Sequence, residues 1–143
     1  MPNVTKVVEI MTKSPFYVDV EDTVRKADDM MKDEKVNQLP VLEGTKIVGM
    51  LTDRKLMEYT LRDIYDWGQT YGEAGFNKII DYEQIMVPIT NVLYPEDSIA
   101  KAVKLMAKYK MDCVPVVDWE MNLLGILTFT DVLLYMHKFL IED

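Results

Sequence analysis

Apolar residues recur along two stretches of the chain with the 3.6-residue spacing that is typical of an amphipathic helix. A short polar pair that can cap a helix, Asp22–Thr23 or Asp97–Ser98, precedes each stretch. The pattern therefore predicts one helix after residue 23 and another after residue 98. The apolar residues that define them at i, i+3 and i+7 are Val24, Ala27 and Met31 in the first stretch and Ile99, Ala102 and Met106 in the second.

Short runs of branched apolar residues follow each predicted helix and have the length and composition of strands. Polar or glycine-containing segments between the runs predict hairpin turns, and a second helix is expected after each hairpin. The expected order is an extended start, a helix, two strands and a helix, and this order occurs twice. The ranges are strands 39–42 and 47–51 with a turn at 43–46, strands 114–117 and 123–127 with a turn at 118–122, and second helices at about 54–67 and 130–141.

The two halves of the chain are similar in sequence at a constant offset. Met11 aligns with Met86 and Pro40 with Pro115, both 75 positions apart, and the offset becomes 76 after one inserted residue in the second turn. So many matches in the same order indicate an internal duplication. Each half has one sheet face for its own helices, and we expect the twin half to cover the other face.

The repeated pattern resembles a tandem pair of CBS domains, known as the Bateman module, over residues 7–136. The resemblance implies an α+β fold in which two βαββα-type repeats pack sheet to sheet about a pseudo-twofold axis. We place the first repeat at 1–62, a linker and helix extension at 63–84 and the second repeat at 85–143. Many members of the family regulate enzymes, channels or transporters, and this chain resembles a stand-alone regulatory module.

Composition restricts the classes of function. The chain has 143 residues, one cysteine and a net charge of −8, with an isoelectric point near 4.7. Such an acidic chain is not expected to bind nucleic acid through a basic face. Since no apolar run approaches the roughly 18 residues of a membrane helix, and no signal-peptide pattern is present, we expect a cytoplasmic protein without a membrane partner.

The segment Gly125–Asp131 matches the nucleotide motif of the CBS family, which is glycine, an apolar residue, any residue, Ser/Thr, any residue, Ser/Thr and aspartate. By this resemblance Asp131 accepts hydrogen bonds from ribose hydroxyls, while hydroxyls and free N–H groups at the helix start hold phosphate. A second interpretation needs no ligand. Thr128 and Asp131 also have the spacing of a capping box, which stabilises a helix start by itself.

The resemblance further implies a ligand site built from both repeats, in the cleft between them. Its ligand would be an adenosine compound such as AMP, ADP, ATP or S-adenosylmethionine, bound as a regulator and not as an obligatory cofactor. The ligand-binding residues expected from the resemblance are Thr12, Pro15, Phe16, Asn37, Gln38, Leu39, Thr128, Thr130 and Asp131.

The corresponding segment of the first repeat departs from the motif. Arg54 and Lys55 replace the second hydroxyl and the aspartate, and a lysine cannot accept a hydrogen bond from ribose. Either these residues form a solvated first turn, or their cations face a phosphate. We therefore expect at most a weaker second site, formed by Thr52, Arg54, Lys55, Val87, Ile89, Asp112 and Cys113.

An enzymatic function is not expected. The chain has a single histidine, His137, to pair with Cys113, and it has no P-loop, no GxGxxG segment and no cluster of metal ligands. The alternative to a ligand sensor is a protein-protein interaction module that binds no nucleotide and acts through dimer contacts on an unknown regulated protein.

The second helices predict a homodimer because they carry more apolar residues than one small core requires. The aromatic residues of the linker either pack on the core or form a partner surface or a lid. The helix residues are Leu56, Met57, Leu61, Val132, Leu133, Tyr135, Met136 and Phe139, and the linker aromatics are Tyr65, Trp67, Tyr71, Phe76 and Tyr82.

Overall fold

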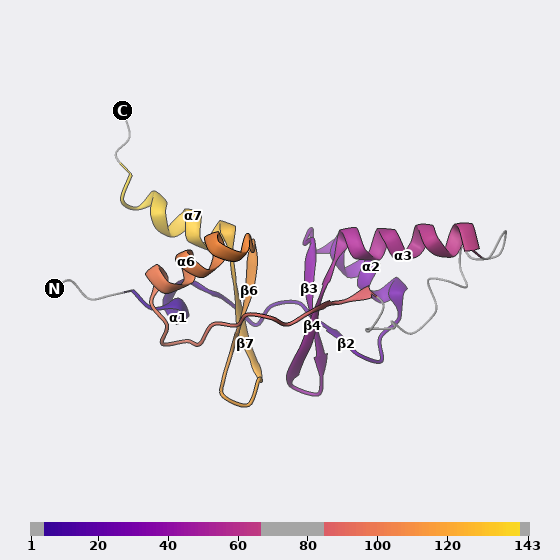
Figure 1. Ribbon diagram of the computed structural model, residues 1–143, viewed down its shortest axis with the longest axis horizontal. Coiled ribbons are helices and arrows are strands. Elements are labelled where there is room, and N and C mark those ends of the chain that lie inside the picture. Colours follow the sequence, from indigo (N-terminus) through magenta and orange to yellow (C-terminus); the bar gives the residue numbers. More distant parts are fainter. Residues whose placement is uncertain (1–4, 67–84, 141–143) are drawn as a thin grey trace. The chain divides into compact units, whose positions relative to one another are not determined.

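The computed structural model describes residues 5–66 and 85–140, and the chain forms two compact units (Figure 1). The first unit contains residues 1–15 together with 90–143, and the second contains residues 16–89. Each unit therefore combines the opening segment of one sequence repeat with the helices and the hairpin of the other. Helices and strands occur in both units, as the predicted α+β class requires.

The first unit is a three-stranded antiparallel sheet with helices packed on it. The strand order is β1-β7-β6, so the opening strand of the chain pairs with the last strand, with Thr12 opposite Ile126 and Lys13 opposite Gly125. The core contains Val7 and side chains of α6, α7 and the hairpin. The elements are α1 (Val7–Ile10), β1 (Thr12–Lys13), α6 (Ile99–Tyr109), β6 (Cys113–Val117), β7 (Leu123–Thr128) and α7 (Phe129–His137).

The second unit repeats this plan with a four-stranded sheet in the order β2-β3-β4-β5. Strand β2 is parallel to β3, and the other neighbours are antiparallel. Helices α2 and α3 lie beside each other and against β3 and β4 (Figure 1). The elements are β2 (Val18–Asp19), α2 (Val24–Asp33), β3 (Gln38–Glu43), β4 (Lys46–Thr52), α3 (Asp53–Asp66) and β5 (Val87–Pro88).

The first helix of each repeat begins where the sequence predicts it. Thr23 accepts a hydrogen bond from the N–H of Lys26, and Ser98 accepts one from the N–H of Lys101. Such caps are each worth about 1 kcal/mol. All of the apolar residues that predicted α2 and α6 are buried, so the periodicity identified the core faces of both helices.

Two features of the first unit differ from the expected elements. The short helix α1 replaces part of the extended start, because the N–H groups of Val7 and Val8 bond to the carbonyls of Asp97 and Pro95 in a segment distant in sequence. Helix α7 ends at His137 and not near residue 141, because the next N–H groups bond to carbonyls three residues back and tighten the chain into turns.

The predicted linker lies almost entirely outside the described residues. Nothing is described for 67–84, so the linker aromatics Trp67, Tyr71, Phe76 and Tyr82 lie outside the described residues, as does the side chain of Tyr65.

Among the residues that are described, no helix is long and apolar enough to cross a membrane.

Lysine occupies a left-handed backbone position after the first helix of each repeat. Lys35 has φ of 55°, and Lys110 has φ of 54°. Lys110→Gly removes the steric conflict of a Cβ in this conformation and is expected to raise the free energy of unfolding by up to about 1 kcal/mol. Urea unfolding measures the change. The control, Lys104→Gly in the middle of α6, should lower stability by about 1 kcal/mol, and equal effects at the two positions would contradict the assignment.

Candidate functional site

The nucleotide motif lies where β7 joins α7. Thr128 is the last residue of β7 and the N-cap of α7. Its hydroxyl accepts a hydrogen bond from the Asp131 N–H at 3.2 Å, and Asp131 Oδ2 accepts one from the Thr128 N–H at 3.0 Å. These two bonds form the capping box that the spacing predicted. They do not use all of the acceptor capacity of the carboxylate, which has two oxygens and about four lone-pair directions.

A third donor reaches the same carboxylate from the start of the chain. The Thr12 hydroxyl lies 3.1 Å from Asp131 Oδ1 and 3.1 Å from Oδ2. Pairing of β1 with β7 places it there, because Thr12 is directly opposite Ile126, shortly before the strand gives way to α7. The structure thus brings together Thr12, Thr128 and Asp131, three residues that the sequence assigned to one site from positions 119 apart.

Other predicted residues of the first unit surround this turn. Thr130 is exposed in the first turn of α7, and Pro15 ends the N-terminal segment of the unit. The Asp112 carbonyl accepts a hydrogen bond from the Phe129 N–H at 3.0 Å, and Cys113 is opposite Thr128 in the hairpin. Asp112 and Cys113 were assigned to the second site, and they lie in the same unit as Thr128.

The Cys113 thiol is not activated as a nucleophile. Its residue is only 8% exposed, and burial raises the pKa of the thiol to about 12, with smaller contributions from the negative charges of Asp112 and Asp131. The thiolate is the nucleophilic form of cysteine, so a thiol protonated at neutral pH is not activated for covalent chemistry. In the described parts of the chain, no three metal-ligating side chains gather.

The remaining residues of the predicted main site belong to the second unit. The Asn37 carbonyl accepts a hydrogen bond from the Asp53 N–H at 2.9 Å, and Gln38 is opposite Thr52. Phe16 is half exposed. Leu39 is completely buried in the core, so its side chain is not available to a ligand and only its main chain could contribute.

The first-repeat motif keeps the cap and loses the acceptor. Thr52 accepts a hydrogen bond from the Lys55 N–H at 3.1 Å, as Thr128 does from Asp131. The side chains of Arg54 and Lys55 approach Glu58 on their own helix, at 3.6 Å and 3.8 Å. The solvated first turn is thus the arrangement present in the structure, with both cations facing a carboxylate.

The second unit also lacks a counterpart of the Thr12 hydroxyl. Strand β5 pairs with β4 so that Val87 is opposite Met50, in the register that Thr12 has with Ile126. Val87 has no hydroxyl, and Ile89, the other predicted residue there, lies just beyond the strand. The hydroxyl and the carboxylate that meet in the first unit are therefore both replaced at the equivalent positions of the second.

The motif glycines are required by the opening strands. A Cβ on Gly125 would lie 2.7 Å from the Thr12 carbonyl oxygen, and one on Gly49 would lie 2.2 Å from the Met86 sulfur. The group that approaches Gly125 is the chain itself, because β1 pairs with β7 at this position and Lys13 lies opposite the glycine.

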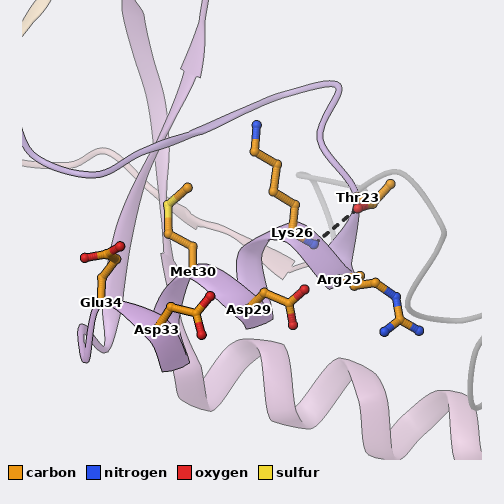
Figure 2. A pocket seen from close by; sticks show the side chains of 7 residues that line it. All are labelled: Thr23, Arg25, Lys26, Asp29, Met30, Asp33 and Glu34. Carbon is orange, nitrogen blue, oxygen red and sulfur yellow. Dashed lines mark hydrogen bonds between the residues drawn. The ribbon is translucent and has the colours of Figure 1, made fainter.

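Two surface hollows in the second unit contain none of the predicted site residues. One, of about 360 Å³, lies beside α2 and α3 and has buried Met31 and Leu56 in its lining. The other, of about 420 Å³, runs along α2 (Figure 2). Its charged groups are mixed in sign, so it has no net positive field for an anion. The second hollow is lined by Thr23, Arg25, Lys26, Asp29, Met30, Asp33 and Glu34.

The sequence of the chain matches the model of the CBS domain twice, over residues 7–62 and 83–138. The chain therefore belongs to the CBS-domain family and carries two copies of the domain, as the internal repeat predicted.

Curated relatives include proteins of very different size. The chain is 32% identical over 124 residues to inosine-5'-monophosphate dehydrogenase of Korarchaeum cryptofilum and 28% identical over 123 residues to homoserine O-acetyltransferase of Methanocorpusculum labreanum. These matches cover 87% and 85% of this chain and only 22% of each enzyme. The CBS domain-containing protein YhcV of Bacillus subtilis is 28% identical over 90% of this chain and 83% of its own length.

Solved structures share the fold across almost the whole chain. CBSX2, determined in complex with AMP, has a TM-score of 0.75 at 24% identity and covers 94% of this chain and 97% of its own. The CBS domain pair of protein MJ0100, determined with 5'-methylthioadenosine and S-adenosyl-L-methionine, has a TM-score of 0.75 at 21% identity and covers 96% and 100%.

Gly125→Ala tests how closely β1 approaches the motif. The new Cβ would meet a backbone oxygen, which cannot move without displacing β1, so we expect a loss of about 1–3 kcal/mol in the free energy of unfolding. Gly49→Ala is the matched control, because the flexible Met86 side chain that it meets can change rotamer. Urea unfolding of both variants should give the larger loss at Gly125, and the reverse order would contradict the prediction.

Proposed function

We propose that the chain is a regulatory module that binds an adenosine-containing ligand through the Thr128–Asp131 turn. The observation that carries the proposal is a carboxylate with spare acceptor capacity at the start of α7, next to the exposed hydroxyl of Thr130. A vicinal diol can donate one hydrogen bond to each oxygen of such a carboxylate. The helix N-terminus beside it favours negative charge, and its free N–H groups can hold phosphate.

The relatives support the choice of ligand class. CBSX2 was determined with AMP, and MJ0100 with two other adenosine compounds that differ in what replaces the phosphate. The shared part of these ligands is the nucleoside, and the ribose diol is the part that Asp131 is suited to bind. The family resemblance assigns Phe16 and the main chain of Asn37, Gln38 and Leu39 to the adenine base, and this assignment stays a prediction.

We expect one strong ligand site per chain. Its equivalent in the first repeat has Lys55 in place of the carboxylate, and that lysine and Arg54 face Glu58. A phosphate at that position would have to compete with Glu58 for both cations, and no acceptor for the ribose is provided by the motif. Binding calorimetry with AMP should therefore find a stoichiometry near one per chain.

The large enzymes among the relatives suggest how such a module is used. The chain corresponds to about a fifth of the dehydrogenase and of the acetyltransferase, so in those proteins the matching part is joined to much longer sequence. We propose that this chain is not itself catalytic and that ligand binding alters its contacts with a separate regulated protein.

Asp131→Asn and Asp131→Ala test the ligand site. Each removes the charged acceptor, and hydrogen bonds to charged groups are worth about 1.5–3 kcal/mol, so AMP or S-adenosylmethionine affinity should fall about tenfold to a hundredfold. Calorimetry measures the change, after a thermal-shift panel of adenosine compounds has identified the ligand that binds most tightly.

The capping box makes a stability control necessary. Asp131→Ala also loses the bond from the Thr128 N–H and should lower the free energy of unfolding by about 1 kcal/mol. Asp131→Asn keeps an acceptor for the cap and should lose affinity with little loss of stability. Lys55→Ala should change neither. Normal affinity in both Asp131 variants would reject the ligand site and leave the interaction module.

An exposed apolar surface on α7 supports a dimer in addition to ligand binding. Leu133 is 63% exposed and Phe139, just beyond the helix, is 68% exposed. Two residues assigned to this surface by the sequence, Leu56 and Val132, are buried in the cores and are not available to a partner. Tyr135 is partly buried against the core. The other predicted residues are exposed, namely Met57, Leu61, Leu133, Met136 and Phe139, and so are Leu134 and Leu140, which the sequence did not assign to this surface.

Light scattering tests the dimer. The wild-type chain should have twice the monomer mass at micromolar concentration, and Leu133→Glu should shift it toward monomer, because a buried unpaired charge at an interface is costly. Val103→Glu is the matched control, since Val103 is an exposed apolar residue on a different helix, α6. A monomeric wild-type chain would contradict the dimer without affecting the ligand proposal.

A further inference from the structure

The Thr12 hydroxyl contacts both carboxylate oxygens of Asp131. It lies 3.1 Å from each carboxylate oxygen, so it spans the edge between them and does not select one lone pair. That edge is where a vicinal diol would place its two hydroxyls, one to each oxygen. In the free protein, a single side-chain hydroxyl thus occupies the position that two ligand hydroxyls require.

Apart from the Thr12 contact, the hydrogen bonds of Asp131 leave the edge between its two carboxylate oxygens open to a vicinal diol. Oδ2 already accepts the Thr128 N–H as part of the capping box, and this bond holds the carboxylate in a fixed orientation. A vicinal diol that donates one hydrogen bond to each oxygen from the same side would approach the edge that Thr12 covers. It cannot do so while the Thr12 hydroxyl stays between them.

We propose that the Thr12–Asp131 hydrogen bond is a latch that closes the diol position in the free protein and that the ligand must displace. This inference rests on the proposed binding of an adenosine ligand and adds to it an internal competitor. Only the first unit contains this competitor, because Val87 and Lys55 replace Thr12 and Asp131 at the equivalent positions of the second unit.

The latch joins the opening segment of the chain to the start of α7, so its release affects this segment as well as the ligand site. Thr12 belongs to the two-residue strand β1, and the chain passes from the first unit to the second between Pro15 and Phe16. Between Thr12 and Pro15, Ser14 has φ of 49°, a conformation that non-glycine residues seldom adopt. Release of the Thr12 hydroxyl removes one of the attachments between this segment and α7.

Thr12→Val removes the hydroxyl and keeps the size and branching of the side chain. Because the ligand no longer displaces a bond to Asp131, affinity for the best-binding adenosine ligand should rise about three- to tenfold in calorimetry. Thr12→Ser keeps the hydroxyl and should leave the affinity close to wild type. Thr90→Val makes the same change at an exposed threonine whose hydroxyl accepts from Asn91, and it should have no effect. Unchanged or weaker binding in Thr12→Val overturns the latch.

A ligand-free measurement separates failure of the latch from failure of the ligand site. In a double-mutant cycle of Thr12→Val and Asp131→Ala, followed by urea unfolding, the two changes should be coupled by about two- to tenfold in the unfolding equilibrium constant. Coupling without binding of any adenosine compound to the wild-type chain would reject the proposed function and, with it, the role of the bond as a latch. Ligand binding without coupling would reject the latch alone.

Discussion

The fit of the opening strand over a motif glycine is the constraint on which the rest of the first unit depends. Strand β1 lies so close to Gly125 that a methyl group on this glycine would clash with the Thr12 carbonyl. Only this approach allows Thr12 to pair opposite Ile126 and to reach the carboxylate at the start of α7. One missing side chain therefore sets the position of a strand, and the strand sets the surroundings of Asp131.

The same constraint operates in the second unit with a different chemical result. Gly49 admits Met86, and β5 pairs with β4 in the register that β1 has with β7. The backbone plan is repeated while the side chains that follow it are not. A duplicated fold can thus keep its architecture while the proposed ligand site is present in one copy, because strand pairing depends on backbone and volume, whereas the proposed ribose contact depends on one carboxylate.

Asp131 combines a structural role, the capping of α7, with the binding role proposed for it. Its capping bond to Thr128 stabilises α7 with or without a ligand, and it also fixes the carboxylate in the orientation that binding would need. The two interpretations of the motif are therefore not exclusive. A group already ordered by a cap loses little further freedom when a ligand binds, which lowers the entropic cost of association.

The sequence alone determined the elements and the family. Periodic apolar residues identified α2 and α6 with their caps, the constant offset identified the duplication, and the motif selected Thr128, Thr130 and Asp131 as the proposed ligand-binding turn, because all of these are local patterns or repeats of local patterns. Resemblance to the family added Thr12. The tertiary structure decided what no local pattern contains: that Thr12 spans both oxygens of Asp131, that Leu56 and Val132 are buried while Leu133 is exposed, and that α7 ends at His137. These features depend on which segments meet across more than a hundred residues, and contacts at that separation are fixed by packing of the whole unit.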